Sequence, residues 1–160
     1  MNAAYKKCGI FRYAQPYMLC NGYRIGPNNK PDKAKFQLAD GSYRTKPHQA
    51  ICPTAVYKQS PYYQEEVVGM LKRILVDKDS SDGIMSNWEP YMFDFKGCFC
   101  PRCKEEFIKY SGLKKADIDE AWPTKIIINH KDKWVKFRSW QHAKMCVQLE
   151  KTINLRMISC

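Results

Sequence analysis

The order of the expected secondary-structure elements predicts a parallel α/β fold. Strand-like segments at residues 10–18 and 83–89 are separated by a helix-like segment that begins at Ser60, and another helix-like segment begins at Pro101. Strands that alternate with helices are typical of parallel sheets, because a parallel pair needs a long crossover connection. The 160 residues suffice for one domain with a buried core, but not for a large enzyme barrel of about 250 residues.

The first half of the chain combines a short helix, a strand and a long loop. Residues 2–8 have the pattern of a helix end, and Gly9 is expected to stop that helix before the strand at residues 10–18. We expect residues 27–50 to form a loop insertion. Within it, Asp40-Gly41 lies between two short strand-like runs and therefore predicts a hairpin.

The next helix has a clear start signal. Ser60 can accept a backbone hydrogen bond at the N-cap, and Pro61 suits the first helical turn. Five apolar residues then recur at helical spacing and predict one buried stripe: Val67, Met70, Leu71, Ile74 and Leu75.

Two further helices are expected after the second strand. One begins at Pro101, ends at Gly112 and turns Cys103, Phe107 and Ile108 inward. The last helix is marked by an apolar series: Trp134, Phe137, Met145, Leu149 and Ile153. Residues 126–128 fit either a short strand or a loop that faces the core.

Composition limits the classes of function. Lys and Arg outnumber Asp and Glu by 27 to 16, and the net charge of +11 would suit an anionic partner. The lysines are scattered, however, and no nucleic-acid reader motif is present, so nucleic-acid binding is not favoured. The chain has neither a secretory signal pattern nor an apolar run of membrane-spanning length. We therefore expect a cytoplasmic protein without membrane contact.

Three cysteines in a C-x-C-x-x-C run, Cys98, Cys100 and Cys103, predict a metal site. Zinc in structural sites takes four protein ligands in a tetrahedron, and thiolates are among its preferred ligands. Cys52 is the leading candidate for the fourth ligand, and His48 is the alternative. A site filled by four thiolates would be structural and not catalytic.

The other single cysteines have a different expected role. They lie in apolar or helical contexts and are expected to be small buried hydrophobic residues: Cys8, Cys20, Cys146 and Cys160.

A carboxylate at the end of the second strand suggests hydrolytic chemistry. Glu89 stands directly before Pro90, and catalytic groups of α/β barrels come from the C-terminal ends of strands. A glutamate in such a place can protonate a glycosidic oxygen. Asn87 should share its face of the strand, and Trp88 or Tyr17 could pack against a sugar ring. A structural acid in a loop remains the alternative for Glu89.

Residues 51–138 resemble the retaining β-galactosidases of glycoside hydrolase family 42. The matching features are a Cys-Pro pair before a helix, a glutamate at the next strand end and the C-x-C-x-x-C loop, here Cys52-Pro53, Glu89 and residues 98–103. The resemblance implies a (β/α)8 barrel, a zinc ion on Cys52 and the three loop cysteines, and Glu89 as the acid/base.

The chain departs from this family at two points. The family's clan has an asparagine directly before the acid/base glutamate, whereas Trp88 stands there in this chain and Asn87 precedes it. The family's nucleophile comes from a much later strand, and no segment before Cys160 matches it. Asp94 is close in sequence to Glu89 but falls in a loop, and we expect it to be a structural acid.

Together these patterns predict that residues 1–160 form one fragment of a barrel glycosidase, with a zinc-binding loop at residues 96–104. Carbohydrate would be the substrate, and the full-length protein could form a homo-oligomer. The expected site residues are the acid/base and four residues that line the sugar site: Glu89, Asn87, Trp88, Tyr17 and Gln15. Two alternatives remain open: a zinc-knuckle module that binds nucleic acid or protein, and a barrel homologue without activity.

Overall fold

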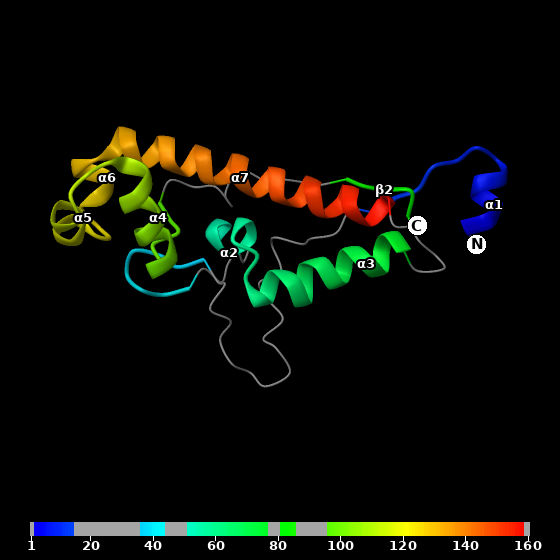
Figure 1. The fold of residues 1–160 in the computed structure, drawn as a ribbon, viewed down its shortest axis with the longest axis horizontal. Helices are drawn as coiled ribbons and strands as arrows, with labels where there is room; N and C mark the ends of the chain where they lie inside the picture. The colour runs from blue at the N-terminus through cyan, green and yellow to red at the C-terminus, as the bar shows by residue number, and fades with distance from the viewer. Residues whose placement is uncertain (1, 15–35, 44–50, 77–80, 86–95, 159–160) are drawn as a thin grey trace.

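The computed structural model describes residues 2–14, 36–43, 51–76, 81–85 and 96–158. These residues form mainly helices, with one pair of short strands (Figure 1). In chain order the elements are α1 (Asn2–Lys7), β1 (Tyr13–Ala14), α2 (Pro53–Tyr57), the π-helical segment η1 (Tyr63–Val68), α3 (Gly69–Val76), β2 (Gly83–Ile84), α4 (Pro101–Ser111), α5 (Lys115–Ala121), α6 (Ile126–Asn129) and α7 (Lys131–Ile158).

The two strands form a parallel pair, as the sequence predicts. Tyr13 is in register with Gly83, and Ala14 with Ile84. The pair is extended by a hydrogen bond from the Met85 N–H to the Ala14 carbonyl, at 2.8 Å. Residues 10–12 of the first expected strand are not in a strand, and residues 15–18 and 86–89 of the two expected strands lie outside the described residues. Within those residues the fold is a helix-rich α/β arrangement, and the two strands do not make a barrel.

Helix α7 is the longest element and supports most of the others. It runs from α4, α5 and α6 at its N-terminal end along α3 at its C-terminal half, and α1 lies beyond its C-terminal end (Figure 1). Helix α2 packs against α7 between these two groups. The final helix expected from the apolar series is therefore confirmed.

The helix that begins after Ser60 has the expected N-cap and an unexpected π-helical segment. The Ser60 hydroxyl accepts a hydrogen bond from the Tyr63 N–H at 3.3 Å. The first part of the helix is then π-helical, in η1, before α3 continues it. The expected stripe faces the core: Val67, Leu71 and Leu75 are buried, and Met70 and Ile74 are half-buried.

Helix α4 has the predicted limits. Pro101 occupies its first turn, and Gly112 ends it in the left-handed conformation with φ of 66°. Cys103 and Phe107 are fully buried, whereas Ile108 is half-buried.

Residues 126–128 form neither a strand nor a loop but the single-turn helix α6. The His130 N–H donates to the Ile126 carbonyl at 3.0 Å, which closes this turn just before α7. Only Ile126 is fully buried, while Ile128 is 80% exposed. A half-buried strand would place both side chains on one face, so the difference in burial reflects the helical turn.

Two hydrophobic clusters make up the core. The first contains the four cysteines of interest together with residues of α2, η1, α3 and the second half of α7. The second is aromatic and joins α4, α5 and α6 to the start of α7. Both clusters therefore include residues of α7, each from a different part of the helix.

The predicted turn at Asp40-Gly41 is present. Gln37 and Tyr43 pair as an antiparallel bridge, and Gly41 has φ of 84°, which favours glycine. The Asp40 carboxylate accepts hydrogen bonds from the Ser42 N–H and hydroxyl, at 2.9 and 2.6 Å. These bonds lower the pKa of Asp40. The turn holds Phe36 and Gln37 beside the cysteine loop.

None of the helices in the described part of the chain combines the length and the apolar character needed to cross a bilayer.

Candidate metal centre

The four cysteines expected to bind metal come together in the structure. Cys52 lies at the N-cap of α2, Cys98 and Cys100 lie on the loop before α4, and Cys103 lies in the first turn of α4. All four are buried, and their Sγ atoms lie within 4.8 Å of one another. Cys52 is confirmed as the fourth member of the cluster. The alternative ligand, His48, lies outside the described residues.

The spacing of the sulfurs fits a tetrahedral metal ion. Zinc binds thiolate sulfur at about 2.3 Å, which places the four sulfurs of a tetrahedron about 3.8 Å apart. The Cys52 Sγ atom lies 3.5 Å from the Sγ atoms of both Cys100 and Cys103. This is far longer than a disulfide bond of about 2.05 Å, and all four thiols are free. The cluster can therefore enclose one ion.

The loop before α4 sends alternate side chains to the two clusters. Cys98 and Cys100 belong to the first cluster, whereas Phe99 belongs to the second. An extended backbone has this alternation, because successive side chains point to opposite sides. The Phe99 ring stacks on Trp134, with ring centroids 5.1 Å apart. The loop is thereby anchored on the side opposite its cysteines.

The hairpin at residues 36–43 holds the start of this loop. The Gln37 N–H donates to the Cys98 Sγ at 3.1 Å, and the Phe99 N–H donates to the Gln37 carbonyl at 2.8 Å. Gly97 allows the approach, because a Cβ added there would lie 2.2 Å from the Cε1 atom of the buried Phe36 ring. A side chain at position 97 would push the loop away from the hairpin.

Cys103 receives two further hydrogen-bond partners from neighbouring helices. Thr54 of α2 places its Oγ1 atom 3.3 Å from the Cys103 Sγ. Gln141 of α7 points its Nε2 atom at the same sulfur, at 3.4 Å, and donates to the Thr54 Oγ1 at 2.8 Å. Hydrogen bonds of this kind orient metal ligands. They also connect the cysteine cluster to α7.

Arg138 completes this arrangement and links the two clusters. Its Nη1 atom donates to the Gln141 Oε1, which fixes the orientation of the amide. Its guanidinium carbon lies 5.6 Å from the centre of the Phe36 ring and 5.9 Å from that of Trp134. Phe36 belongs to the first cluster and Trp134 to the second. Arg138 thus packs between them.

The close packing of four buried sulfurs favours a cation at their centre once the thiols ionise. Burial raises the pKa of Cys52 and of Cys98 well above the ordinary value. Hydrogen bonds from Cys103 and Cys52 instead lower the pKa of Cys100. Four thiolates confined this closely in a buried site would repel one another without a positive charge. A divalent ion would supply that charge and displace the remaining thiol protons.

Arg102 is a basic side chain close to the four cysteines. Partial burial lowers the pKa of Arg102, but the nearby Cys52 and Cys100 sulfurs raise it more, so the net shift is upward. Lys104 pairs instead with Asp119, at 2.7 Å, and Lys96 is exposed.

The other sequence predictions divide into two groups. The expected acid/base Glu89, its neighbours Asn87 and Trp88, and the expected sugar contacts Tyr17 and Gln15 all lie outside the described residues. Among the single cysteines, Cys8 is exposed and Cys146 is half-buried. The expectation of burial is therefore wrong for Cys8, which follows the short helix α1 in an exposed segment. Cys20 and Cys160 lie outside the described residues.

Sequence reasoning missed Thr54 and Gln141. One signal for Gln141 was available: it stands four residues after Phe137 and four before Met145, on the apolar stripe of the last helix. A polar residue on a core-facing stripe needs a buried partner. The Gln37 backbone contact had no such signal, because any residue could supply the N–H.

Comparison of the chain with protein-family models, with curated proteins and with solved structures found no match in any of the three.

Proposed function

We propose that Cys52, Cys98, Cys100 and Cys103 bind one Zn²⁺ ion, and that this ion is structural. The observation that carries the proposal is the convergence of four buried Sγ atoms within 4.8 Å. Four thiolates in a tetrahedral arrangement suit zinc or iron, and zinc is the usual ion of structural sites with four cysteine ligands. With all four positions filled by protein, no position is left for a substrate or a reactive water.

The proposed role of the ion is to fasten the loop before α4 to α2 and, through Gln141, to α7. The ligands come from two segments that are far apart in sequence, around Cys52 and at residues 98–103. A metal that joins distant segments contributes its binding free energy to folding, because the unfolded chain does not hold a preformed site.

Metal analysis of the protein purified without chelators tests this proposal. We expect about one equivalent of zinc, and loss of that zinc in Cys100→Ser and in Cys52→Ser. Cys146→Ser is the matched control, since Cys146 is a free, half-buried cysteine outside the cluster. Less than half an equivalent of any metal would contradict a metal site. One equivalent of iron would contradict the identity of the metal as zinc but not the metal site itself.

We further propose that the protein acts on O-glycosidic bonds, with Glu89 as the acid/base of a retaining β-galactosidase-like enzyme. Two observations support this role. The residues around Glu89 resemble glycoside hydrolase family 42, including the cysteines that form the cluster. In addition, Glu89 follows β2, a strand in a parallel pair, as catalytic residues of α/β barrels do. The zinc would hold the loop that follows this acid.

In this proposal Glu89 protonates the leaving-group oxygen and later activates water. The test is hydrolysis of 4-nitrophenyl β-galactoside by the longest gene product that contains these residues. Glu89→Gln should reduce kcat/KM by at least about 100-fold, since acid–base catalysis contributes about 10²–10⁴. Glu120→Gln, on an exposed side chain of α5, should leave kcat/KM unchanged.

The outcomes separate the two proposals. Equal turnover by Glu89→Gln and the unchanged protein would contradict the role of Glu89. Absence of turnover by that gene product would contradict the glycosidase proposal and leave the zinc proposal standing. Robust turnover by residues 1–160 alone would contradict the expectation that the nucleophile comes from a later strand.

A further inference from the structure

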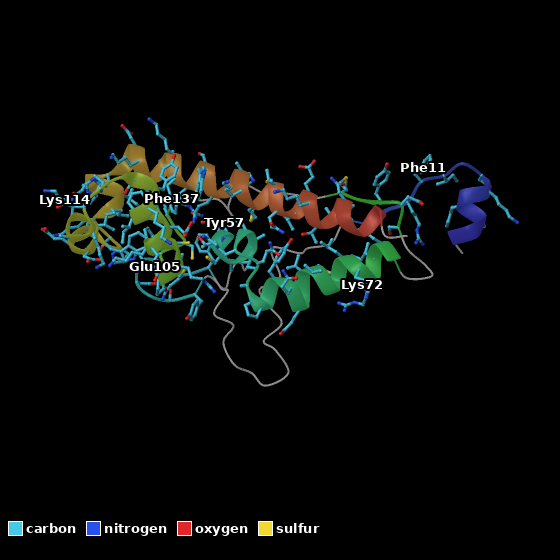
Figure 2. All side chains as sticks on the ribbon, in the orientation of Figure 1. Phe11, Tyr57, Lys72, Glu105, Lys114 and Phe137 are labelled. Carbon is cyan, nitrogen blue, oxygen red and sulfur yellow. The ribbon has the colours of Figure 1, made fainter. Side chains whose placement is uncertain are left out.

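A basic groove lies beside the cysteine cluster and takes no part in metal binding. It has a volume of about 340 Å³ and is formed where α2, α4 and α7 meet. Tyr57, labelled in Figure 2, lies in this region. The remaining lining residues are Lys58, Glu106, Trp140, Lys144, Val147, Gln148 and Lys151.

The floor of the groove is fixed by the helices that carry the metal ligands. Tyr57 is on the same helix as Thr54, and their side-chain oxygens lie 3.4 Å apart. Glu106 follows Cys103 by one turn of α4, and the Tyr57 hydroxyl donates to its carboxylate at 3.2 Å. Burial raises the pKa of Tyr57, which keeps this donor protonated. The groove therefore has a rigid polar floor.

The one carboxylate of the groove is already neutralised. Glu106 is 8% exposed and forms ion pairs with Lys58 at 3.2 Å and Lys109 at 3.4 Å. A cation would have to compete with both lysines for it. Glu106 therefore does not make the groove a cation site.

Two lysines of α7 remain to give the groove its positive charge. Lys144 and Lys151 are exposed and stand two helical turns apart, about 10 Å along the axis. Lys144 lies over the Trp140 ring, 5.7 Å from its centre, and no ion pair of either lysine with another described residue is found. Trp140 and the exposed Val147 add apolar surface to the lining of the groove.

We propose that this groove binds a small organic phosphate, with the phosphate on Lys144 and Lys151 and the organic part against Trp140 and Val147. Its volume falls at the lower end of the range for small-molecule sites, about 300–1,000 Å³, which favours a small ligand over a nucleic-acid strand. Lysine ammonium groups bind phosphate as point charges. The net charge of +11 would attract such anions from solution.

The test is titration calorimetry of the zinc-loaded protein with adenosine monophosphate, inorganic phosphate and adenosine. We expect adenosine monophosphate to bind with a dissociation constant at or below about 1 mM, and more tightly than either of the other two. The double variant Lys144→Gln/Lys151→Gln should weaken this binding at least about tenfold, equivalent to about 1.4 kcal/mol.

The matched control is Lys131→Gln/Lys136→Gln, which removes the same charge from exposed positions of α7 outside the groove. It should change the dissociation constant less than about twofold, because distant surface charges are screened by salt. Equal weakening by both double variants would show only general attraction of anions and would overturn the proposal. So would the absence of adenosine monophosphate binding up to about 5 mM, well above the expected dissociation constant, or binding of adenosine as tight as that of the monophosphate. Zinc content and circular dichroism confirm that each variant is folded.

Discussion

At the scale of single residues, Cys103 shows how the site depends on more than its ligands. Its sulfur lies within hydrogen-bonding distance of Thr54 and Gln141, and Gln141 in turn accepts from Arg138. All three partners are buried. These side chains hydrogen-bond to one another in series, so the loss of one leaves buried polar atoms without a partner.

Gln141→Leu should therefore weaken both folding and metal binding. We expect the free energy of unfolding to fall by about 1–3 kcal/mol, the cost of leaving buried polar groups unsatisfied. Zinc affinity should fall about 10–100-fold, as for other residues that support metal ligands. Urea denaturation and competition with a chromophoric chelator measure the two effects. Gln64→Leu, on an exposed side chain, should change neither, and an unaltered zinc affinity in Gln141→Leu would refute the role given to Gln141.

Gly97→Ala should disturb the cysteine loop through a steric clash. The added Cβ would lie 2.2 Å from the Phe36 ring, and that ring is buried at 1% exposure with Arg138 above it. Either the ring or the loop must move, with a loss of about 1–3 kcal/mol. Thermal unfolding measures the loss. Gly69→Ala is the control, because the nearest atom to its Cβ would be 3.8 Å away. Equal stability of the two variants would contradict this packing.

Spacing predicted Cys98, Cys100 and Cys103 as a metal-binding set, because three cysteines in six positions have few other uses. Cys52 was preferred to His48 as the fourth member because it precedes a helix start. The residues around the ligands were harder to predict. Thr54 contacts the Cys103 sulfur, and the Gln37 N–H donates to the Cys98 sulfur. Both contacts form only when folding brings the hairpin, α2 and α7 together. Such contacts depend on tertiary structure, which a local pattern does not encode.

At the scale of elements, α7 joins the two clusters. Its first turns face the second, aromatic hydrophobic cluster through Trp134 and Phe137. Its second half faces the first hydrophobic cluster, which contains the four cysteines, through Met145 and Leu149. Its apolar series predicted this helix well, because the helical period repeats over many turns. Residues 126–128 were less predictable, because a three-residue apolar run fits a strand as well as a helical turn.

Trp134→Ala tests how far the aromatic cluster supports the cysteine loop. Trp134 is fully buried and stacks on Phe99, which lies between Cys98 and Cys100 in the sequence. We expect a loss of about 3–5 kcal/mol in unfolding free energy, as for other large aromatic residues in cores. Zinc affinity should fall as well. Val135→Ala, at a position 40% exposed, should cost less than about 0.5 kcal/mol if it behaves as a surface site. Full zinc affinity in Trp134→Ala would show that the loop does not depend on this stacking.

At the scale of the whole molecule, the four clustered cysteines lie where distant parts of the chain meet. The hairpin at residues 36–43, α2, the loop before α4 and α7 all contact the four cysteines or their immediate partners. The parallel pairing of β1 with β2 was predictable from the strand–helix–strand order. A complete barrel was not testable from this pair, because the described residues hold two strands.

Metal removal should destabilise the whole described fold. Binding of a structural zinc contributes several kcal/mol to folding, and in a domain of this size each kcal/mol shifts Tm by about 2–4 °C. We therefore expect a chelator to lower Tm by at least about 10 °C, and re-addition of zinc to restore it. Differential scanning calorimetry measures the shift. A Tm that does not respond to the chelator, with zinc shown to be removed, would contradict a structural role.

The measurement that tests the central claim most directly is X-ray absorption at the zinc edge of the purified protein. We predict four sulfur neighbours at about 2.3 Å and no nitrogen or oxygen neighbour, as in structural zinc sites with four cysteine ligands. Cys52→Ser should lose one sulfur neighbour or the metal itself, while Cys146→Ser should give an unchanged spectrum. A spectrum with two or fewer sulfur neighbours, or with nitrogen and oxygen ligands in place of sulfur, would contradict the proposal that these four cysteines hold the ion together.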